Sequence, residues 1–200
     1  RLDKVIFENI NISASSGKIV FIKGGNGSGK TTLLKTLVNI LELNEGDIFW
    51  MGKKTKKNIF KFFDSVSIIF DHPTSTKELT VVENINFWKK ISLSKISNEM
   101  ILKLLDILGL NQYLNKKVSH LSKGEIKKLE LSRLIIEEKK LWILDEPYSG
   151  LDNKSISLIK TIFFEISISS LLINVLISFI LFVSIFIFKF NLSKSLLFSF

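Results

Sequence analysis

A glycine-rich segment near the start of the chain has the residues and spacing of a phosphate-binding loop. Gly24 and Gly29 are separated by four residues and followed at once by Lys30 and Thr31, which is the G-x-x-x-x-G-K-[ST] pattern of the Walker A motif. Glycines allow a tight backbone turn in which successive N–H groups point inward and bind an anion. We expect Lys30 to reach the β- and γ-phosphates of a nucleotide, and the Thr31 hydroxyl to bind Mg²⁺. The predicted nucleotide-binding residues are Gly24, Gly25, Asn26, Gly27, Ser28, Gly29, Lys30, Thr31 and Thr32.

An acidic pair, Asp145 and Glu146, directly follows a run of four apolar residues, 141–144. Such a run predicts a buried parallel strand that delivers the pair at its carboxyl end, which is the Walker B arrangement. We expect Asp145 to hold Mg²⁺ together with Thr31, and Glu146 to orient or deprotonate the water that attacks the phosphate. Glu146 and Lys30 are therefore the candidate catalytic residues.

The segments around both motifs predict the elements that would position them. Residues 18–23 indicate a short buried strand before the glycine loop, and the helix after the loop points its positive end at the phosphates. Further strands are predicted at residues 4–12, 47–51 and 66–70. Helices are predicted at residues 97–110 and after residue 125 up to about residue 139.

Composition limits the class of protein. A length of 200 residues suits one α/β domain, and the absence of cysteine excludes disulfides, thiolate chemistry and Cys-based zinc sites. The net charge of +9 is compatible with an anionic partner, either nucleic acid or a membrane surface, or with an A+T-rich coding bias toward Lys. No Arg/Lys–aromatic pattern of a nucleic-acid module is found, so no nucleic acid partner is expected. The basic run at residues 53–57 is either a phosphate or lipid-headgroup contact or a solvated loop.

Two further segments carry a family resemblance. Residues 121–125 (Leu-Ser-Lys-Gly-Glu) lie ahead of residues 144–147 (Leu-Asp-Glu-Pro), and together they resemble an ABC-transporter nucleotide-binding subunit. The first segment is similar to that family's signature motif, which implies that Ser122 and Gly124 bind the γ-phosphate held by the other subunit of a homodimer. Glu125 replaces the usual Gln and brings negative charge toward that phosphate.

The resemblance also implies a fold and a set of cofactors. The expected fold is an α/β P-loop NTPase with a mixed central sheet, an antiparallel β subdomain and an α-helical signature subdomain at about residues 74–135. The expected ABC-type domain covers residues 1–160, and its cofactors are ATP and Mg²⁺. His72 falls where the family has its Q-loop glutamine, so it is either a third metal ligand or a loop histidine without a ligand.

Residues 72–88 and 141–147 are most similar to one subgroup, the haem-exporter ATP-binding subunit of cytochrome c maturation. This resemblance implies haem export, with integral membrane transporter subunits as partners. It also implies a position at an inner membrane, on the mitochondrial matrix side or the bacterial cytoplasmic side.

The tail, residues 161–200, departs from the family pattern. No histidine follows His120, so the family's switch histidine, expected near Ser178, is absent. An alternative function is therefore a nucleotide-dependent assembly subunit with impaired hydrolysis. Residues 166–188 contain no charged residue and exceed the roughly 20 residues that span a bilayer. This segment is either a transmembrane helix, the degenerate last strands of the core, or a drifted or frame-shifted end.

Overall fold

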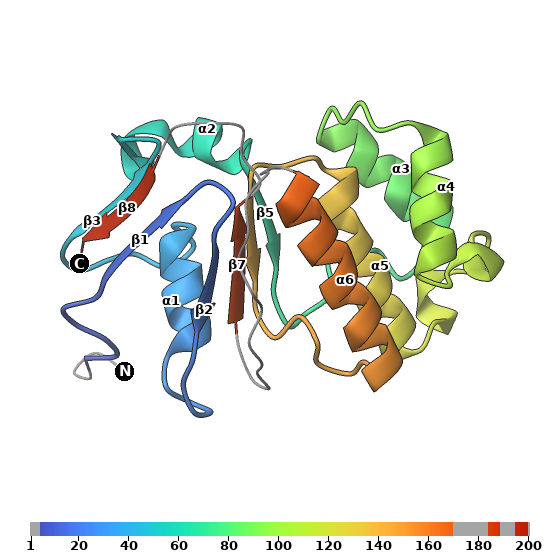
Figure 1. Ribbon diagram of the computed structural model, residues 1–200, viewed down its shortest axis with the longest axis horizontal. Coiled ribbons are helices and arrows are strands. Elements are labelled where there is room, and N and C mark those ends of the chain that lie inside the picture. The colour runs from blue at the N-terminus through green and yellow to red at the C-terminus, as the bar shows by residue number, and fades with distance from the viewer. Residues whose placement is uncertain (1–4, 170–183, 189–194, 200) are drawn as a thin grey trace.

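The computed structural model describes residues 5–169, 184–188 and 195–199, which form two four-stranded sheets and six α-helices (Figure 1). In chain order the elements are β1 (Asn11–Ser15), β2 (Ile19–Ile22), α1 (Lys30–Leu37), β3 (Asp47–Trp50), β4 (Lys53–Lys54), α2 (Ile59–Phe63), β5 (Val66–Ile69), α3 (Val81–Ile91), α4 (Asn98–Ile107), α5 (Lys123–Ile136), β6 (Leu141–Leu144), α6 (Asn153–Ser169), β7 (Ser184–Phe188) and β8 (Ser195–Ser199). Short 3-10 turns lie at Thr55–Asn58, Asn111–Tyr113 and Val118–His120.

One sheet mixes parallel and antiparallel strands and leads into both predicted motifs. Its order is β2-β7-β6-β5, in which β5 and β6 are parallel and β7 is antiparallel to both of its neighbours. The second sheet, β1-β8-β3-β4, is antiparallel throughout. Figure 1 shows α3 and α4 at the opposite end of the molecule from β1, β3 and β8. The predicted α/β architecture, with a mixed sheet, an antiparallel sheet and a helical part, is confirmed.

Strand β6 is buried at all four positions, as predicted for the run that precedes Asp145. Trp142 and Leu144 pack into a core with helices α3 to α6, whereas Leu141 and Ile143 pack with α1 on the other face. Side chains alternate across a strand, so a strand between two helical layers has to be apolar at every position. The two cores thus fix the strand whose carboxyl end bears the acidic pair.

Helix boundaries follow from capping residues. Thr80 with Glu83 and Ser122 with Glu125 form capping boxes that begin α3 and α5, each satisfying backbone N–H groups at the helix end. The helix predicted at residues 97–110 is observed as α4. It begins after the N-cap Ser97 and ends before Gly109, which has a left-handed φ of +69°.

The first predicted strand is displaced. Residues 5–10 are not in a strand, and β1 begins at Asn11, because Asn9 has a φ of +55° that interrupts extended backbone. The basic run is also more ordered than a loop: Lys53–Lys54 pair with β3 as strand β4, and Thr55–Asn58 form a 3-10 turn.

Most of the apolar segment 166–188, for which a transmembrane helix is one of three alternatives, lies outside the described residues, which omit residues 170–183, Ser178 among them. Of the remainder, residues 166–169 end helix α6, whereas Ser184–Phe188 form strand β7 rather than a helix, because this segment pairs with β2 and β6. Within residues 5–169, 184–188 and 195–199, no helix is both long enough and apolar enough to cross a bilayer.

Candidate nucleotide-binding and catalytic site

The glycine loop runs from the end of β2 to the first turn of α1, as the motif requires. Gly29 is the N-cap of α1, with a left-handed φ of +91° that disfavours other residues. At Gly24 the constraint is different: a Cβ there would lie 2.5 Å from the Ser28 Oγ, so the Ser28 side chain would have to move. The loop closes on itself through a 3.3 Å hydrogen bond from the Ser28 N–H to the Gly25 carbonyl, directly before the N-terminus of α1, which is the end of a helix that favours anions.

Lys30 lies across this loop. Its Nζ donates hydrogen bonds of 2.8 Å to the carbonyl oxygens of Gly24 and Gly25. The ammonium charge therefore lies at the mouth of the loop and adds to the helix dipole of α1. This geometry favours the predicted contact with phosphate.

The two motifs meet through Thr31 and Asp145, which are 114 positions apart in the chain. Thr31 Oγ1 donates a 2.6 Å hydrogen bond to Asp145 Oδ2. Asp145 is only 2% exposed, and its N–H donates to the Ile69 carbonyl at 2.8 Å, which ties the end of β6 to β5. A hydroxyl and a carboxylate side by side are the hard oxygen ligands that Mg²⁺ prefers, so these two residues fit the predicted metal site.

Glu146 has the exposed side chain of the acidic pair. Its φ of +45° is unusual for a residue with a Cβ and costs about 1–3 kcal/mol. At this turn the two carboxylates are placed in different environments: Asp145 is buried, whereas Glu146 is exposed to solvent. This is the arrangement expected of a residue that handles a water molecule.

The signature-like segment begins helix α5. Ser122 is the N-cap: its Oγ accepts from the Glu125 N–H at 3.3 Å, and its own N–H donates to Glu125 Oε2 at 2.6 Å. Glu125 also accepts a hydrogen bond from Tyr113, which together with the bond from Ser122 lowers the pKa of the Glu125 carboxyl. Glu125 is therefore turned back onto the cap, where it occupies one of the donors expected to face phosphate.

Gly124 lies against the turn that follows the acidic pair. A Cβ at this position would come 3.3 Å from the Gly150 carbonyl oxygen. The segment predicted to bind a partner's nucleotide is therefore in contact, within its own chain, with the turn behind the Walker B strand.

His72 is not brought to the metal ligands by any described contact. It is exposed in the loop after β5, and no hydrogen bond or ion pair of its side chain is found in the described part of the chain. The described residues also contain no group of three or more His, Cys, Asp or Glu side chains that could hold a metal. The role of His72 as a third ligand stays a prediction.

Comparisons with known proteins identify the family of this chain. The family model described as ABC transporter matches residues 7–149, which include the glycine loop, the signature-like segment and the acidic pair. The chain belongs to the ABC transporter family.

Curated members of the family resemble this ABC domain over most of its length. A cytochrome c biogenesis ATP-binding export protein of Reclinomonas americana is 40% identical over 164 residues, covering 81% of this chain and 73% of the relative. The protein of the same name from Hahella chejuensis is 34% identical over 166 residues, covering 82% and 78%.

Solved structures of ABC ATP-binding proteins share the fold. One from Pyrococcus furiosus has a TM-score of 0.61 at 25% identity and covers 69% of this chain and 66% of its own. A second, an ATP-binding cassette of an ABC transporter, has a TM-score of 0.64 at 26% identity and covers 82% and 72%.

The ABC domain contains a set of buried charges that the sequence reasoning missed. Four charged side chains recur every three or four residues along α5 and its C-cap, and all are at most 12% exposed: Lys127, Glu130, Arg133 and the C-cap Glu137. We call them the α5 charge stripe. The signal in the sequence was this helical spacing, but charges at such spacing usually lie on a solvated face.

The α5 charge stripe binds the loop that follows β5. Glu130 accepts hydrogen bonds from the N–H groups of Thr74 (2.9 Å) and Ser75 (2.7 Å) and from Thr74 Oγ1 (2.9 Å). Arg133 donates to Thr74 Oγ1 and to the Ile68 carbonyl and pairs with Glu137 at 3.4 Å. The loop containing His72 is thus tied to the same helix that begins with the signature-like segment.

Lys127 is the member of this stripe that interacts with the acidic pair, Asp145 and Glu146. Burial lowers the pKa of its ammonium. Four carboxylates oppose the shift: Asp71, Glu130, Asp145 and Glu146. A buried cation thus lies on α5 within the field of the acidic pair.

Proposed function

We propose that this chain hydrolyses ATP as one half of a homodimer and that hydrolysis drives export of haem for cytochrome c biogenesis. The observation that supports hydrolysis is the 2.6 Å contact between Thr31 and Asp145, which joins the phosphate loop to the acidic strand end. The proposed export role rests on relatives named cytochrome c biogenesis ATP-binding export proteins. The haem substrate is inferred from the subgroup resemblance of residues 72–88 and 141–147.

The proposed reaction uses residues of both chains. The glycine loop, Lys30 and Thr32 hold the triphosphate, and Ser122 and Gly124 of the second chain close the site over the γ-phosphate. Thr31 and Asp145 would hold Mg²⁺, which neutralises the phosphate charge that develops in the transition state. The oxygen of a water molecule attacks the γ-phosphorus while Glu146 accepts a proton from that water. The bond between the γ-phosphorus and the β,γ-bridging oxygen breaks, which releases ADP and phosphate.

The proposed partners and location follow from export. An ATP-binding chain requires integral membrane subunits to move a substrate, so we place this chain at an inner membrane, on the mitochondrial matrix side or the bacterial cytoplasmic side. The net charge of +9 suits an anionic membrane surface, and no nucleic acid partner is proposed.

Glu146→Gln tests the catalytic assignment. The amide still accepts a hydrogen bond from water but takes no proton, so Mg²⁺-dependent ATP turnover should fall by about 10²- to 10⁴-fold. ATP affinity, measured with a fluorescent analogue, should change less than about threefold. Glu45→Gln is the matched control, because Glu45 is an exposed acid in the turn before β3.

Turnover that survives Glu146→Gln would contradict the proposal. ATP-driven dimerisation without turnover by the unaltered chain, in the presence of its membrane partners, would instead establish the alternative function of a binding subunit with impaired hydrolysis. The absence of a histidine after His120 motivates that arm of the test, since loss of one transition-state donor costs about 10²- to 10³-fold in rate.

A further inference from the structure

The antiparallel sheet and helix α2 form a surface that the ATP site does not use. Residues 50–65, from the end of β3 through β4 and α2, contain five lysines and four phenylalanine or tryptophan residues. We call this segment the 50–65 surface. It includes the basic run at residues 53–57, for which the sequence allows either a phosphate or lipid-headgroup contact or a solvated loop.

Three of the five lysines are available to bind an anion. Lys54 pairs with Asp47 at 2.6 Å and Lys56 approaches Glu42 at 3.7 Å. For Lys53, Lys57 and Lys61, all exposed, the described part of the chain shows no ion pair. The surface therefore retains positive charge after its internal pairs are counted.

Helix α2 directs aromatic side chains both inward and outward. Phe62 is buried and meets Trp50 edge-on, with ring centroids 6.1 Å apart. Phe60 is 84% exposed and Phe63 is 40% exposed, although burial of either ring would be favourable. Positions i and i+3 share one face of a helix, so the two exposed rings lie on the same side of α2.

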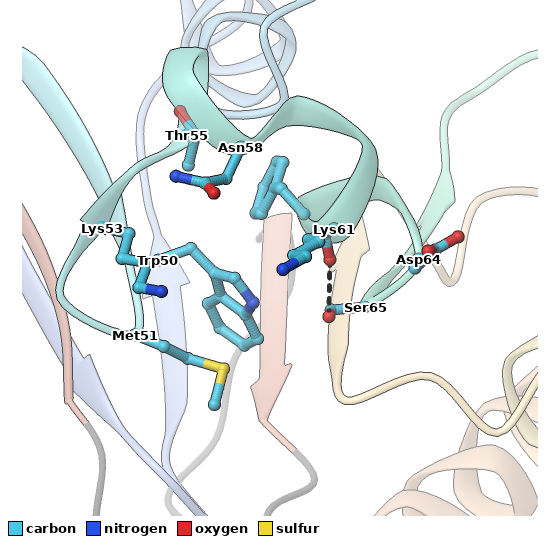
Figure 2. Close-up of a pocket in the computed structure, with 9 residues that line it drawn as sticks. Trp50, Met51, Lys53, Thr55, Asn58, Lys61, Asp64 and Ser65 are labelled. Atoms are coloured by element: carbon cyan, nitrogen blue, oxygen red, sulfur yellow. Dashed lines mark hydrogen bonds between the residues drawn. The ribbon is translucent and has the colours of Figure 1, made fainter.

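A hollow of about 350 Å³ lies within the 50–65 surface, lined by residues from Trp50 to Ser65 (Figure 2). Its lining combines an apolar base, which includes Trp50, with polar groups at Thr55 and Asn58 and the cations Lys53 and Lys61. Figure 2 shows Asp64, its one acidic lining residue, directed away from Trp50. This lining of cations beside apolar side chains suits a ligand in which an anionic group is attached to an apolar group.

We propose that the 50–65 surface binds an anionic phospholipid bilayer, with a headgroup phosphate in the hollow between Lys53 and Lys61. Phe60 and Phe63 enter the boundary between headgroups and acyl chains, where aromatic rings beside lysines are favoured. This inference rests on the proposed function, because an export ATPase works beside a membrane. It adds a contact with lipid itself, independent of the membrane subunits.

Vesicle flotation of the full chain tests the proposal. Vesicles of phosphatidylcholine alone measure any contribution of the apolar tail, and vesicles that also contain phosphatidylglycerol measure the contribution of charge. Each lysine near an anionic surface strengthens binding roughly fivefold, so the triple variant Lys53→Gln, Lys57→Gln, Lys61→Gln should bind anionic vesicles roughly a hundredfold more weakly. Raised salt should weaken the unaltered protein and leave this variant nearly unchanged.

A matched variant controls for net charge. Lys90, Lys95 and Lys154 are exposed lysines outside the surface, and their joint replacement by Gln removes the same charge. This control should keep most of the binding to anionic vesicles. Phe60→Ser should weaken binding about tenfold without altering its salt dependence. Unchanged thermal unfolding temperatures establish that the variants fold.

Several outcomes would overturn the inference. Equal binding of both triple variants would show a general charge effect. Vesicle binding that survives the Lys53, Lys57, Lys61 variant while copurification with integral membrane subunits is lost would assign the surface to a protein partner. ATP turnover is measured separately without vesicles: if turnover is absent but charge-dependent vesicle binding holds, the proposed function fails and the lipid contact stands.

Discussion

Glu125 shows how one side chain alters a site without leaving its helix cap. Its carboxylate accepts the Ser122 N–H at 2.6 Å, and its charge lies at the helix end that is proposed to face a partner's γ-phosphate. A carboxylate both occupies a donor and opposes the phosphate charge, whereas an amide at the same position keeps the capping box and removes the charge.

Glu125→Gln should therefore strengthen ATP-dependent association of two chains by about three- to tenfold, since a charge near a helix end is worth about 0.3–1 kcal/mol and a phosphate increases that effect. Sedimentation velocity with Mg²⁺-ATP over a range of chain concentrations measures the change. Glu83→Gln, the equivalent substitution in the capping box of α3, is the control and should leave association unchanged. Weaker association of Glu125→Gln would mean that the carboxylate itself assists the site.

At the scale of elements, the α5 charge stripe joins the signature helix to the loop after β5. Glu130 is 2% exposed and satisfies three donors on Thr74 and Ser75, so its removal leaves buried polar groups without partners. The sequence could not reveal this contact. Glu130 and Arg133 recur with the helical period of an ordinary solvated face, and only the depth of α5 beneath the loop buries them.

Glu130→Ala should lower the free energy of unfolding by about 3 kcal/mol, because breaking a buried charged network costs about 3–5 kcal/mol. Urea titration followed by circular dichroism measures this loss. Glu99→Ala is the control: Glu99 pairs with Lys103 at 2.7 Å on the exposed face of α4, and such pairs contribute about 0.3–0.5 kcal/mol. A loss below about 1 kcal/mol for Glu130→Ala would show that water replaces the carboxylate.

At the scale of the molecule, the proposed site is complete only in a pair of chains. With hydrolysis blocked by Glu146→Gln, Mg²⁺-ATP should convert the protein to a species of twice the 22.9 kDa of one chain, measured by light scattering after size exclusion. Adding Gly124→Asp should abolish that species, because a carboxylate would face the partner's phosphate and its Cβ would press on the Gly150 carbonyl. Ser119→Asp adds the same charge outside the motif and should still dimerise.

The sequence predicted the mixed fold and the elements at both ends of the site, because Walker spacing and a four-residue apolar strand constrain local geometry strongly. It could not separate alternatives for residues 184–188. Hydropathy rates Ser184–Phe188 as part of an apolar span, but apolar residues are equally typical of a strand that pairs on both edges, as β7 does with β2 and β6. Only the pairing partners of β7 distinguish a core strand from a membrane span, and one of these partners, β2, is more than a hundred positions away in the chain.

The position of β7 between β2 and β6 affects the order in which the mixed sheet can form during translation. Among the described strands, β2 joins the mixed sheet only through β7, which is translated long after the glycine loop. While the nascent chain still lacks Ser184–Phe188, the strand that leads into the glycine loop has no neighbour on that edge. We therefore expect the predicted phosphate-binding loop to be among the last parts of the domain to reach its final structure, and the open edge of β2 to be exposed to unwanted strand pairing until β7 is made.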